Sequence, residues 1–86
     1  MKVILTHTAE RDFQRLSSPI RKKALKQLHY LAANLRHPSL RVKKMAGSTH
    51  VWEARIDYHY RFTFQKNDDS FIIRKFGPHD EGLGKP

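Results

Sequence analysis

The sequence contains no cysteine, few acidic residues and no long apolar run. Without cysteine, neither disulfide bonds nor thiolate metal ligands can contribute to a fold or a site. No apolar run approaches the roughly 18 residues that a membrane-spanning helix needs. The apolar start, Met1 to Leu5, is too short for the hydrophobic region of a signal peptide. We therefore expect a cytoplasmic protein without a membrane partner.

The scarcity of acidic residues leaves a strongly basic chain. Seventeen Lys and Arg residues stand against eight Asp and Glu residues, so the net charge is +9 over 86 residues. This length predicts one domain over residues 1–86. Such a basic excess favours a polyanionic partner, namely RNA, DNA or an acidic protein segment. The plainer alternative is a basic protein with no special ligand, but the uneven distribution of the charges favours nucleic acid.

A short strand over residues 2–7 and a helix over residues 9–16 are expected first. The strand carries the apolar triplet Val3-Ile4-Leu5, which we expect to be buried. Thr6 or Thr8 offers a side-chain oxygen that can cap the helix. The sequence thus predicts one strand before the first helix.

The second helix has the clearest pattern in the chain. Ser18 is a suitable N-cap and Pro19 suits the first helical position. The helix is expected to end at residues 36–38, and a second strand is expected over residues 40–45. Apolar residues recur at helical spacing; they are Ile20, Ala24, Leu28, Leu31 and Leu35, with Leu25 and Ala32 widening the stripe.

The stretch from His50 to Asp80 predicts three further strands. In its first two strands, apolar side chains occupy the even positions, namely Trp52, Ala54, Ile56, Tyr60, Phe62 and Phe64. The odd positions are polar or charged, namely Glu53, Arg55, Arg61, Thr63 and Gln65. Because successive strand side chains point to opposite faces, one face is aromatic and the other charged.

The simplest hairpin in this stretch pairs Ile56 with Tyr60 and places Arg55 opposite Arg61. Two like charges facing each other across a ladder oppose folding modestly. A chain that retains such a pair on an open face is expected to use it for an anion.

The last hairpin turns at residues 66–69, and its register is open between two arrangements. A four-residue loop pairs Arg61 with Arg74, whereas a loop one residue longer puts Lys75 on that face. Either arrangement predicts three cations across three strands. The tail over residues 77–86 is expected to be irregular.

This order of elements predicts an α+β fold. Two N-terminal helices should pack on one face of a small, mostly antiparallel, twisted sheet. The aromatic face should meet the helices, and the odd-position face, with its row of cations, should stay open.

The candidate residues suit metal-free cleavage of RNA, which supplies its own nucleophile, the 2′-hydroxyl. Arg55 and Arg61 could hold the scissile phosphate, because guanidinium binds phosphate oxygens through two parallel hydrogen bonds. His79 could act as general acid or base, and Glu53 could be a partner base or orient an arginine. Further nucleic-acid contacts are expected from the basic residues Arg41, Lys43, Lys44, Arg74 and Lys75.

Plainer interpretations of these residues remain open. Glu53 and Arg55 could form a surface ion pair, and His79 could be one of six histidines without a role. We expect no cofactor and no metal ion, because the spacing of Glu53, Asp80 and Glu81 matches no metal motif.

The chain resembles the RelE/ParE superfamily of toxins from bacterial type II toxin–antitoxin systems. Three segments carry the resemblance, which extends over nearly the whole chain. They are Val51-Trp52-Glu53-Ala54-Arg55-Ile56, Tyr60-Arg61-Phe62-Thr63-Phe64 and Phe76-Gly77-Pro78-His79-Asp80.

The resemblance implies a toxin that inhibits translation as a ribosome-dependent mRNA interferase. In such family members the arginine of the Tyr-Arg strand binds the scissile phosphate, and Arg61 matches it. A basic residue on the preceding strand matches Arg55, and a late His or Arg matches His79. The implied partners are a cognate antitoxin, mRNA and the ribosome.

The chain departs from the family pattern at two places. Glu53 stands where some members have a basic residue, and no tyrosine follows Tyr60. These departures leave room for the ParE-type alternative, in which the same fold inhibits DNA gyrase without cutting RNA. A basic RNA-binding module without toxicity is the third alternative.

Overall fold

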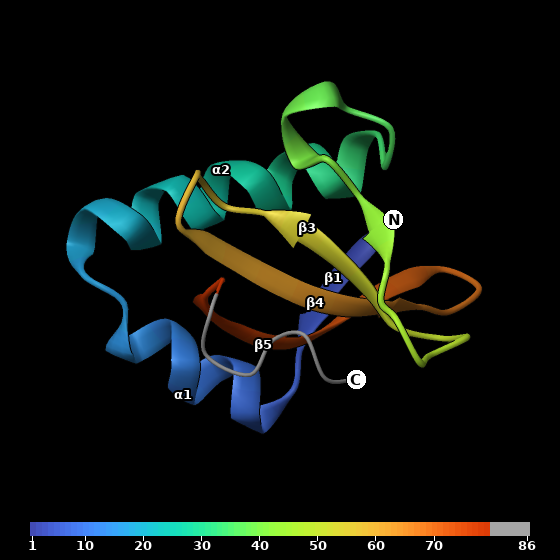
Figure 1. Cartoon of the computed structure of the whole chain (residues 1–86), viewed down its shortest axis with the longest axis horizontal. Coiled ribbons are helices and arrows are strands. Elements are labelled where there is room, and N and C mark those ends of the chain that lie inside the picture. Colours follow the sequence, from blue (N-terminus) through green and yellow to red (C-terminus); the bar gives the residue numbers. More distant parts are fainter. Residues whose placement is uncertain (80–86) are drawn as a thin grey trace.

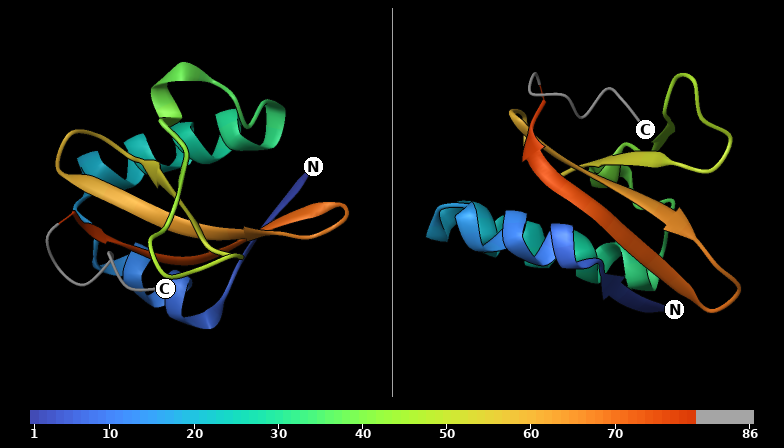
Figure 2. Two further views of the ribbon diagram at one scale, coloured as in Figure 1. Left: turned by 45° about the vertical axis from the view of Figure 1, so that its right-hand side comes forward. Right: turned by 90° about the horizontal axis from the view of Figure 1, so that it is seen from below.

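The structure is a computed structural model that describes residues 1–79. Its elements run in the order β1 (Lys2–Leu5), α1 (His7–Arg15), α2 (Ser18–Ala33), η1 (Pro38–Leu40), β2 (Lys43–Lys44), β3 (Trp52–Arg55), β4 (Tyr60–Lys66) and β5 (Ser70–Pro78) (Figure 1). The strands form one sheet in the order β1-β5-β4-β3-β2. Only the β1–β5 pair in it is parallel. Both helices lie on the same side of this sheet (Figure 2), so the expected α+β fold is confirmed.

The two helices begin close to their expected starts. The Thr6 hydroxyl accepts a hydrogen bond from the Ala9 backbone at 3.1 Å and caps α1. Ser17, rather than Ser18, is the N-cap of α2, and its side chain makes no capping hydrogen bond. Leu25, which widens the apolar stripe in the sequence, does not join the core and is 56% exposed. One residue corresponds to about 100° around a helix, which turns Leu25 away from the neighbouring buried Ala24.

The strand expected over residues 40–45 is reduced to two residues. Pro38 begins the short helix η1, and Arg41 has a left-handed backbone with φ of 46°. This conformation interrupts an extended chain, so only Lys43 and Lys44 pair with β3. At the opposite edge of the sheet, the expected burial of Ile4 was also wrong, since this residue is 47% exposed.

The aromatic face of β3 and β4 meets the helices, as expected. Ala54, Phe62 and Phe64 are at most 1% exposed and belong to the core beneath the two helices. The prediction that the opposite face stays open was wrong at its centre, where Glu53, Arg61 and Thr63 are buried. The positive charge of Arg61 on this face is therefore largely removed from water.

The last hairpin follows neither expected register, but Lys75 does lie on the odd-position face, opposite Thr63, as the second arrangement predicted. Lys66 pairs with Phe71, so the loop begins one residue later than expected. A register irregularity between Thr63 and Phe64 shifts the pairing by one further residue. As a result Arg61 lies opposite Gly77, and the predicted row of three arginines does not form.

The last strand also extends further than expected. β5 continues to Pro78, although residues 77–86 were expected to be irregular. The remainder of that expectation, over residues 80–86, lies outside the described residues, as do Asp80 and Glu81. The candidate His79 directly follows β5.

Candidate anion-binding site

The turn between β3 and β4 is fixed by a carboxylate. Oδ1 of Asp57 accepts hydrogen bonds from the backbone amides of His59 and Tyr60, each at 2.9 Å. Nζ of Lys23, on α2, approaches Oδ2 to 3.3 Å. Partial burial alone would raise the pKa of Asp57, but the hydrogen bonds and Lys23 together hold this pKa below its ordinary value of 3.8.

Arg61 fastens the same turn from the sheet. Its Nη1 donates to the backbone carbonyls of Asp57 at 2.6 Å, Tyr58 at 2.9 Å and Tyr60 at 3.0 Å. Its Nε lies 3.8 Å from Oε1 of Glu53, and the residue is only 7% exposed. The Arg61 guanidinium therefore stabilises the turn, and this structural role is separate from any binding of a ligand.

Arg55 lies directly opposite Arg61, as the sequence predicted. The Ile56 amide donates to the Tyr60 carbonyl at 2.9 Å. Because hydrogen-bonded and non-hydrogen-bonded pairs alternate along an antiparallel ladder, Arg55 and Arg61 form a non-hydrogen-bonded pair, in which side chains are closer. Nε of Arg55 is buried and has no hydrogen-bond partner among the described residues. This arginine has a buried donor that an acceptor could satisfy.

A pocket of about 390 Å³ joins these groups. It is lined by Arg55, Tyr58, His59, Arg61, Pro78 and His79. The backbone amide of His79 donates to the carbonyl of His59 at 2.8 Å, which ties the end of β5 to the turn. The three candidate catalytic residues, Arg55, Arg61 and His79, thus line one pocket. We refer to this site as the arginine pocket.

Three residues of the arginine pocket, Tyr58, His59 and Pro78, were not among the sequence candidates. Tyr58 and His59 belong to the tight turn that the parity pattern predicted, between two arginines expected to pair. Their position in this turn could have identified them, because residues of a turn between two strands lie next to the last pair of residues on the strands. The pocket therefore offers two histidines, His59 and His79.

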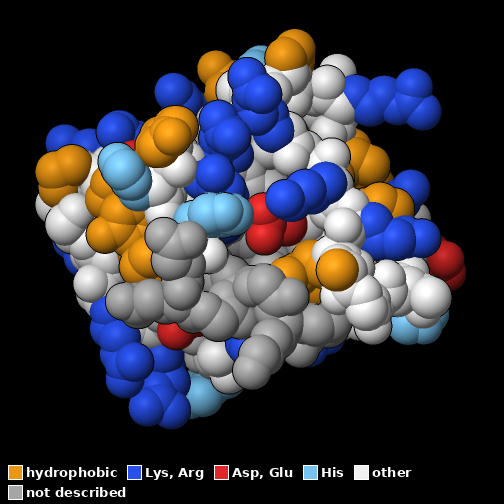
Figure 3. Space-filling model, viewed as in Figure 1, with side chains coloured by type: hydrophobic (Ala, Val, Ile, Leu, Met, Phe, Trp, Pro, Cys, Tyr) orange, Lys and Arg blue, Asp and Glu red, His pale blue; other side chains and the backbone are white. Residues whose placement is uncertain are grey.

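Glu53 lies outside this pocket, in the next row of the sheet. Its Oε1 is 3.8 Å from Nζ of Lys43 and 3.8 Å from Nε of Arg61. The row runs from Lys43 through Glu53 and Thr63 to Lys75. Space filling shows Lys and Arg side chains gathered around a small acidic patch on this face (Figure 3). This position suits Glu53 to orienting Arg61.

The remaining basic candidates do not join the site. Lys44 lies over the Trp52 ring, with its Nζ 5.3 Å from the ring centroid. Arg41 is exposed beside η1 and lines a separate shallow hollow. Arg74 lies at the irregular part of β5, where its carbonyl accepts from the Thr6 hydroxyl at 3.2 Å. The structure therefore disperses the five predicted nucleic-acid contacts and leaves only Lys43 and Lys75 in the row next to Arg55 and Arg61.

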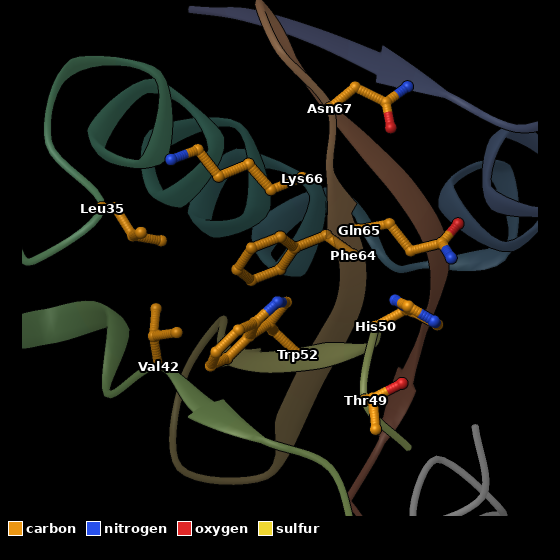
Figure 4. Close-up of a pocket in the computed structure, with 9 residues that line it drawn as sticks. All are labelled: Leu35, Val42, Thr49, His50, Trp52, Phe64, Gln65, Lys66 and Asn67. Carbon is orange, nitrogen blue, oxygen red and sulfur yellow. The ribbon is translucent and has the colours of Figure 1, made fainter.

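A second pocket, of about 480 Å³, lies at the other end of β3 and β4. Apolar side chains from different elements face it, including Leu35, Val42, Trp52 and Phe64 (Figure 4). His50 is its only histidine, and none of the candidate catalytic residues line it. Polar side chains complete its lining, namely Thr49, His50, Gln65, Lys66 and Asn67, so this pocket is mixed in character.

The described residues offer no site for a metal ion and no membrane span. Within residues 1–79, no three His, Asp or Glu side chains gather in a way that could hold a metal. Neither of the helices in that part of the chain is long and apolar enough to cross a membrane.

Comparison with known proteins places the chain in a family. The family model described as "ParE toxin of type II toxin-antitoxin system, parDE" matches residues 3–82. The chain belongs to this toxin family. It is accordingly a type II toxin of the RelE/ParE superfamily, which confirms the resemblance noted in the sequence. No curated protein sequence matches it.

Solved structures of toxins share this fold. The YoeB/ParE toxin from Agrobacterium tumefaciens has a TM-score of 0.75 at 16% identity, covering 92% of this chain and 99% of that one. The archaeal RelE in the RelE–RelB complex from Pyrococcus horikoshii OT3 has a TM-score of 0.76 at 20% identity, covering 93% and 96%. The isolated RelE toxin of E. coli has a TM-score of 0.74 at 16% identity, covering 95% and 87%. At these identities the likeness establishes the fold alone.

Proposed function

We propose that this toxin is a metal-independent mRNA interferase that cleaves RNA on the ribosome. The observation that supports it is the arginine pocket, which brings together two guanidinium groups and two histidines. Phosphodiester cleavage needs cations on the phosphate and a group that transfers protons. RNA supplies the nucleophile, its own 2′-hydroxyl.

In the proposed mechanism, Arg55 is the principal phosphate ligand. Among residues 1–79 its Nε has no hydrogen-bond partner, and the residue lines the pocket in which we place the phosphate. Arg61 adds positive charge while Glu53 and the turn carbonyls fix its position. His79 transfers a proton to or from the reacting oxygens, because an imidazole ring nitrogen can either donate or accept a proton. The attacking 2′-oxygen forms the new bond to phosphorus as the bond to the 5′-oxygen breaks.

Brief induction in a bacterial host, followed by primer extension on cellular mRNAs, tests this proposal. We expect new cuts within translated regions for the wild type. Arg55→Ala and His79→Ala should reduce cutting by about 10²–10⁴-fold, the usual effect of losing such a group. His29→Ala, which changes an exposed histidine of α2, is the matched control and should cut normally. Normal cutting by both pocket variants would overturn the assignment.

Inhibition of DNA gyrase is the second candidate function. It is favoured by the match to the ParE toxin model and by the engagement of Arg61 Nη1 with the turn. This candidate predicts intact transcripts together with a DNA-damage response and arrested growth. Intact transcripts with normal growth would instead favour a basic RNA-binding module without toxicity.

A cognate antitoxin is the proposed protein partner in the cytoplasm. RelB and YefM occupy this place in the solved complexes with RelE and YoeB, whose toxins share the fold. The net charge of +9 favours an acidic segment that covers the basic face. Co-expression with the product of the neighbouring gene should restore growth. A neighbouring gene whose product neither binds the toxin nor restores growth would count against this partner.

A further inference from the structure

Tyr58 is an exposed aromatic side chain on the turn between β3 and β4. It is 75% exposed, more than any other large apolar side chain among residues 1–79. The other exposed large apolar residues, Met1, Ile4 and Leu25, are between 47% and 56% exposed and are aliphatic. Packing within the chain therefore does not account for the ring at this position.

The backbone beneath Tyr58 is held from several directions. Its carbonyl accepts from Arg61 at 2.9 Å, and the flanking Asp57 caps the turn through two backbone amides. The carbonyl of His59 accepts from the His79 amide at 2.8 Å. A tyrosine has only two side-chain torsions to order, so a ring on a fixed turn binds a ligand at low entropic cost.

Tyr58 and His59 border the cationic groups of the arginine pocket. The Tyr58 and His59 rings meet edge to face, with centroids 5.0 Å apart and planes at 82°. Both residues line the pocket together with Arg55 and Arg61. An aromatic ring beside a cluster of cations is the combination that binds single-stranded nucleic acid, with the backbone on the cations and a base on the ring.

We infer that Tyr58, supported by His59, forms a stacking subsite for one unpaired base of an RNA strand whose phosphate lies in the arginine pocket. This inference rests on the proposed function, because it takes RNA as the ligand of the pocket. The subsite positions the strand and takes no part in proton transfer. Because every base has an aromatic face, the subsite discriminates weakly among bases and does not require the tyrosine hydroxyl.

Fluorescence anisotropy with a labelled 12-nucleotide single-stranded RNA at low salt tests the subsite. Tyr58→Ala should weaken binding by about fivefold to a hundredfold, the range expected for one lost base–ring stack. Tyr58→Phe should bind within about twofold of the wild type, because the ring is retained. Leu25→Ala, which truncates another exposed apolar side chain, is the control and should bind normally.

A second probe isolates the base from the phosphate. In an RNA of the same length with abasic central positions, the wild type should bind as weakly as Tyr58→Ala, and the variant should lose nothing further. Equal binding of Tyr58→Ala and the wild type to intact RNA would overturn the subsite, as would equal losses in Tyr58→Ala and Tyr58→Phe. Absence of RNA binding, with Tyr58→Ala instead abolishing capture of purified gyrase, would overturn it in favour of a protein contact.

The subsite and the proposed function can fail separately. If Tyr58→Ala cut transcripts normally and bound RNA with unchanged affinity, the proposed subsite would be refuted and the cleavage proposal would stand. If RNA binding depended on the Tyr58 ring but the wild type cut no transcripts, the subsite would be supported and the cleavage proposal would be refuted.

Discussion

The side-chain amide of Gln27 donates a hydrogen bond to the backbone carbonyl of Arg55 across 2.9 Å. The same Nε2 donates to the Ser39 carbonyl at 3.2 Å, and Gln27 is only 3% exposed. One buried polar side chain of α2 therefore joins the helix, the segment that leads into β2 and the strand that carries Arg55. Because buried polar groups are costly when unpaired, this contact fixes the end of β3 at the arginine pocket.

Replacement of Gln27 should lower the stability of the fold. Gln27→Ala leaves the two carbonyl acceptors without their buried donor, so we expect a loss of about 1–3 kcal/mol in the free energy of unfolding. Urea denaturation followed by circular dichroism measures it. Gln14→Ala, at an exposed position of α1, is the control and should change stability by less than about 0.5 kcal/mol. Equal effects of the two substitutions would contradict a structural role for the Gln27 contacts.

Arg55 and Arg61 should respond oppositely to removal of their charge. Arg55→Leu removes a like-charge pair and a buried donor that has no partner within residues 1–79, so stability should stay the same or rise by up to about 1 kcal/mol. Arg61→Leu removes three hydrogen bonds to the turn and should cost about 1–3 kcal/mol. Both variants should lose mRNA cutting. Thermal unfolding of the two purified variants, beside primer extension, makes the comparison.

A particular outcome would reverse the roles given to these two arginines. If Arg55→Leu destabilised the chain as much as Arg61→Leu, Arg55 would be a structural residue and its free Nε would carry no functional meaning. If Arg55→Leu were stable and still cut mRNA, the phosphate would have to lie elsewhere.

The first hairpin and its arginine pair could be predicted from the sequence because the alternating pattern and the short turn together determine them. The pairing of β3 with β4 runs without irregularity from Trp52 opposite Phe64 to Arg55 opposite Arg61, and the short turn allows few registers. The register then places Arg55 opposite Arg61 without further information. His79 joined the same pocket because it directly follows β5, the next strand in the meander.

The errors arose where a single residue departs from regular geometry. The irregularity between Thr63 and Phe64 shifts β5 by one residue, and no residue type in that stretch signals it. The left-handed backbone at Arg41 shortens β2, and the sequence gives no indication of it either. The burial of Glu53 depends on how neighbouring strands place Lys43 and Arg61 around it, which is a tertiary effect.

Substitution of Glu53 separates orientation from base catalysis. Glu53→Gln keeps an oxygen acceptor near Nε of Arg61, so it should retain at least about a tenth of the cutting activity. Loss of a general base would instead cost about 10²–10⁴-fold. Initial cleavage rates on translating ribosomes, measured for the wild type and the variant, decide between these roles. Glu53→Ala provides the comparison, since it should reduce activity further by removing the oxygen acceptor near Nε of Arg61 as well as the charge.

The carboxylate of Asp57 should make stability depend on acid pH. The pKa of Asp57 lies below 3.8 in the folded chain, despite partial burial, because the His59 and Tyr60 amides and Lys23 favour its charged form. A depressed folded pKa contributes stability above the unfolded value of about 3.9, and this contribution is lost as the pH falls through the folded value.

Asp57→Asn keeps the oxygen that caps the turn but removes the charge. At about pH 7 the wild type should therefore exceed the variant in unfolding free energy by roughly 1 kcal/mol or less, because Lys23 is half exposed. Urea denaturation from about pH 7 to pH 2.5 should show this difference shrinking towards zero at the acid end. A difference that stayed constant over this range would show that the charge of Asp57 does not stabilise the turn.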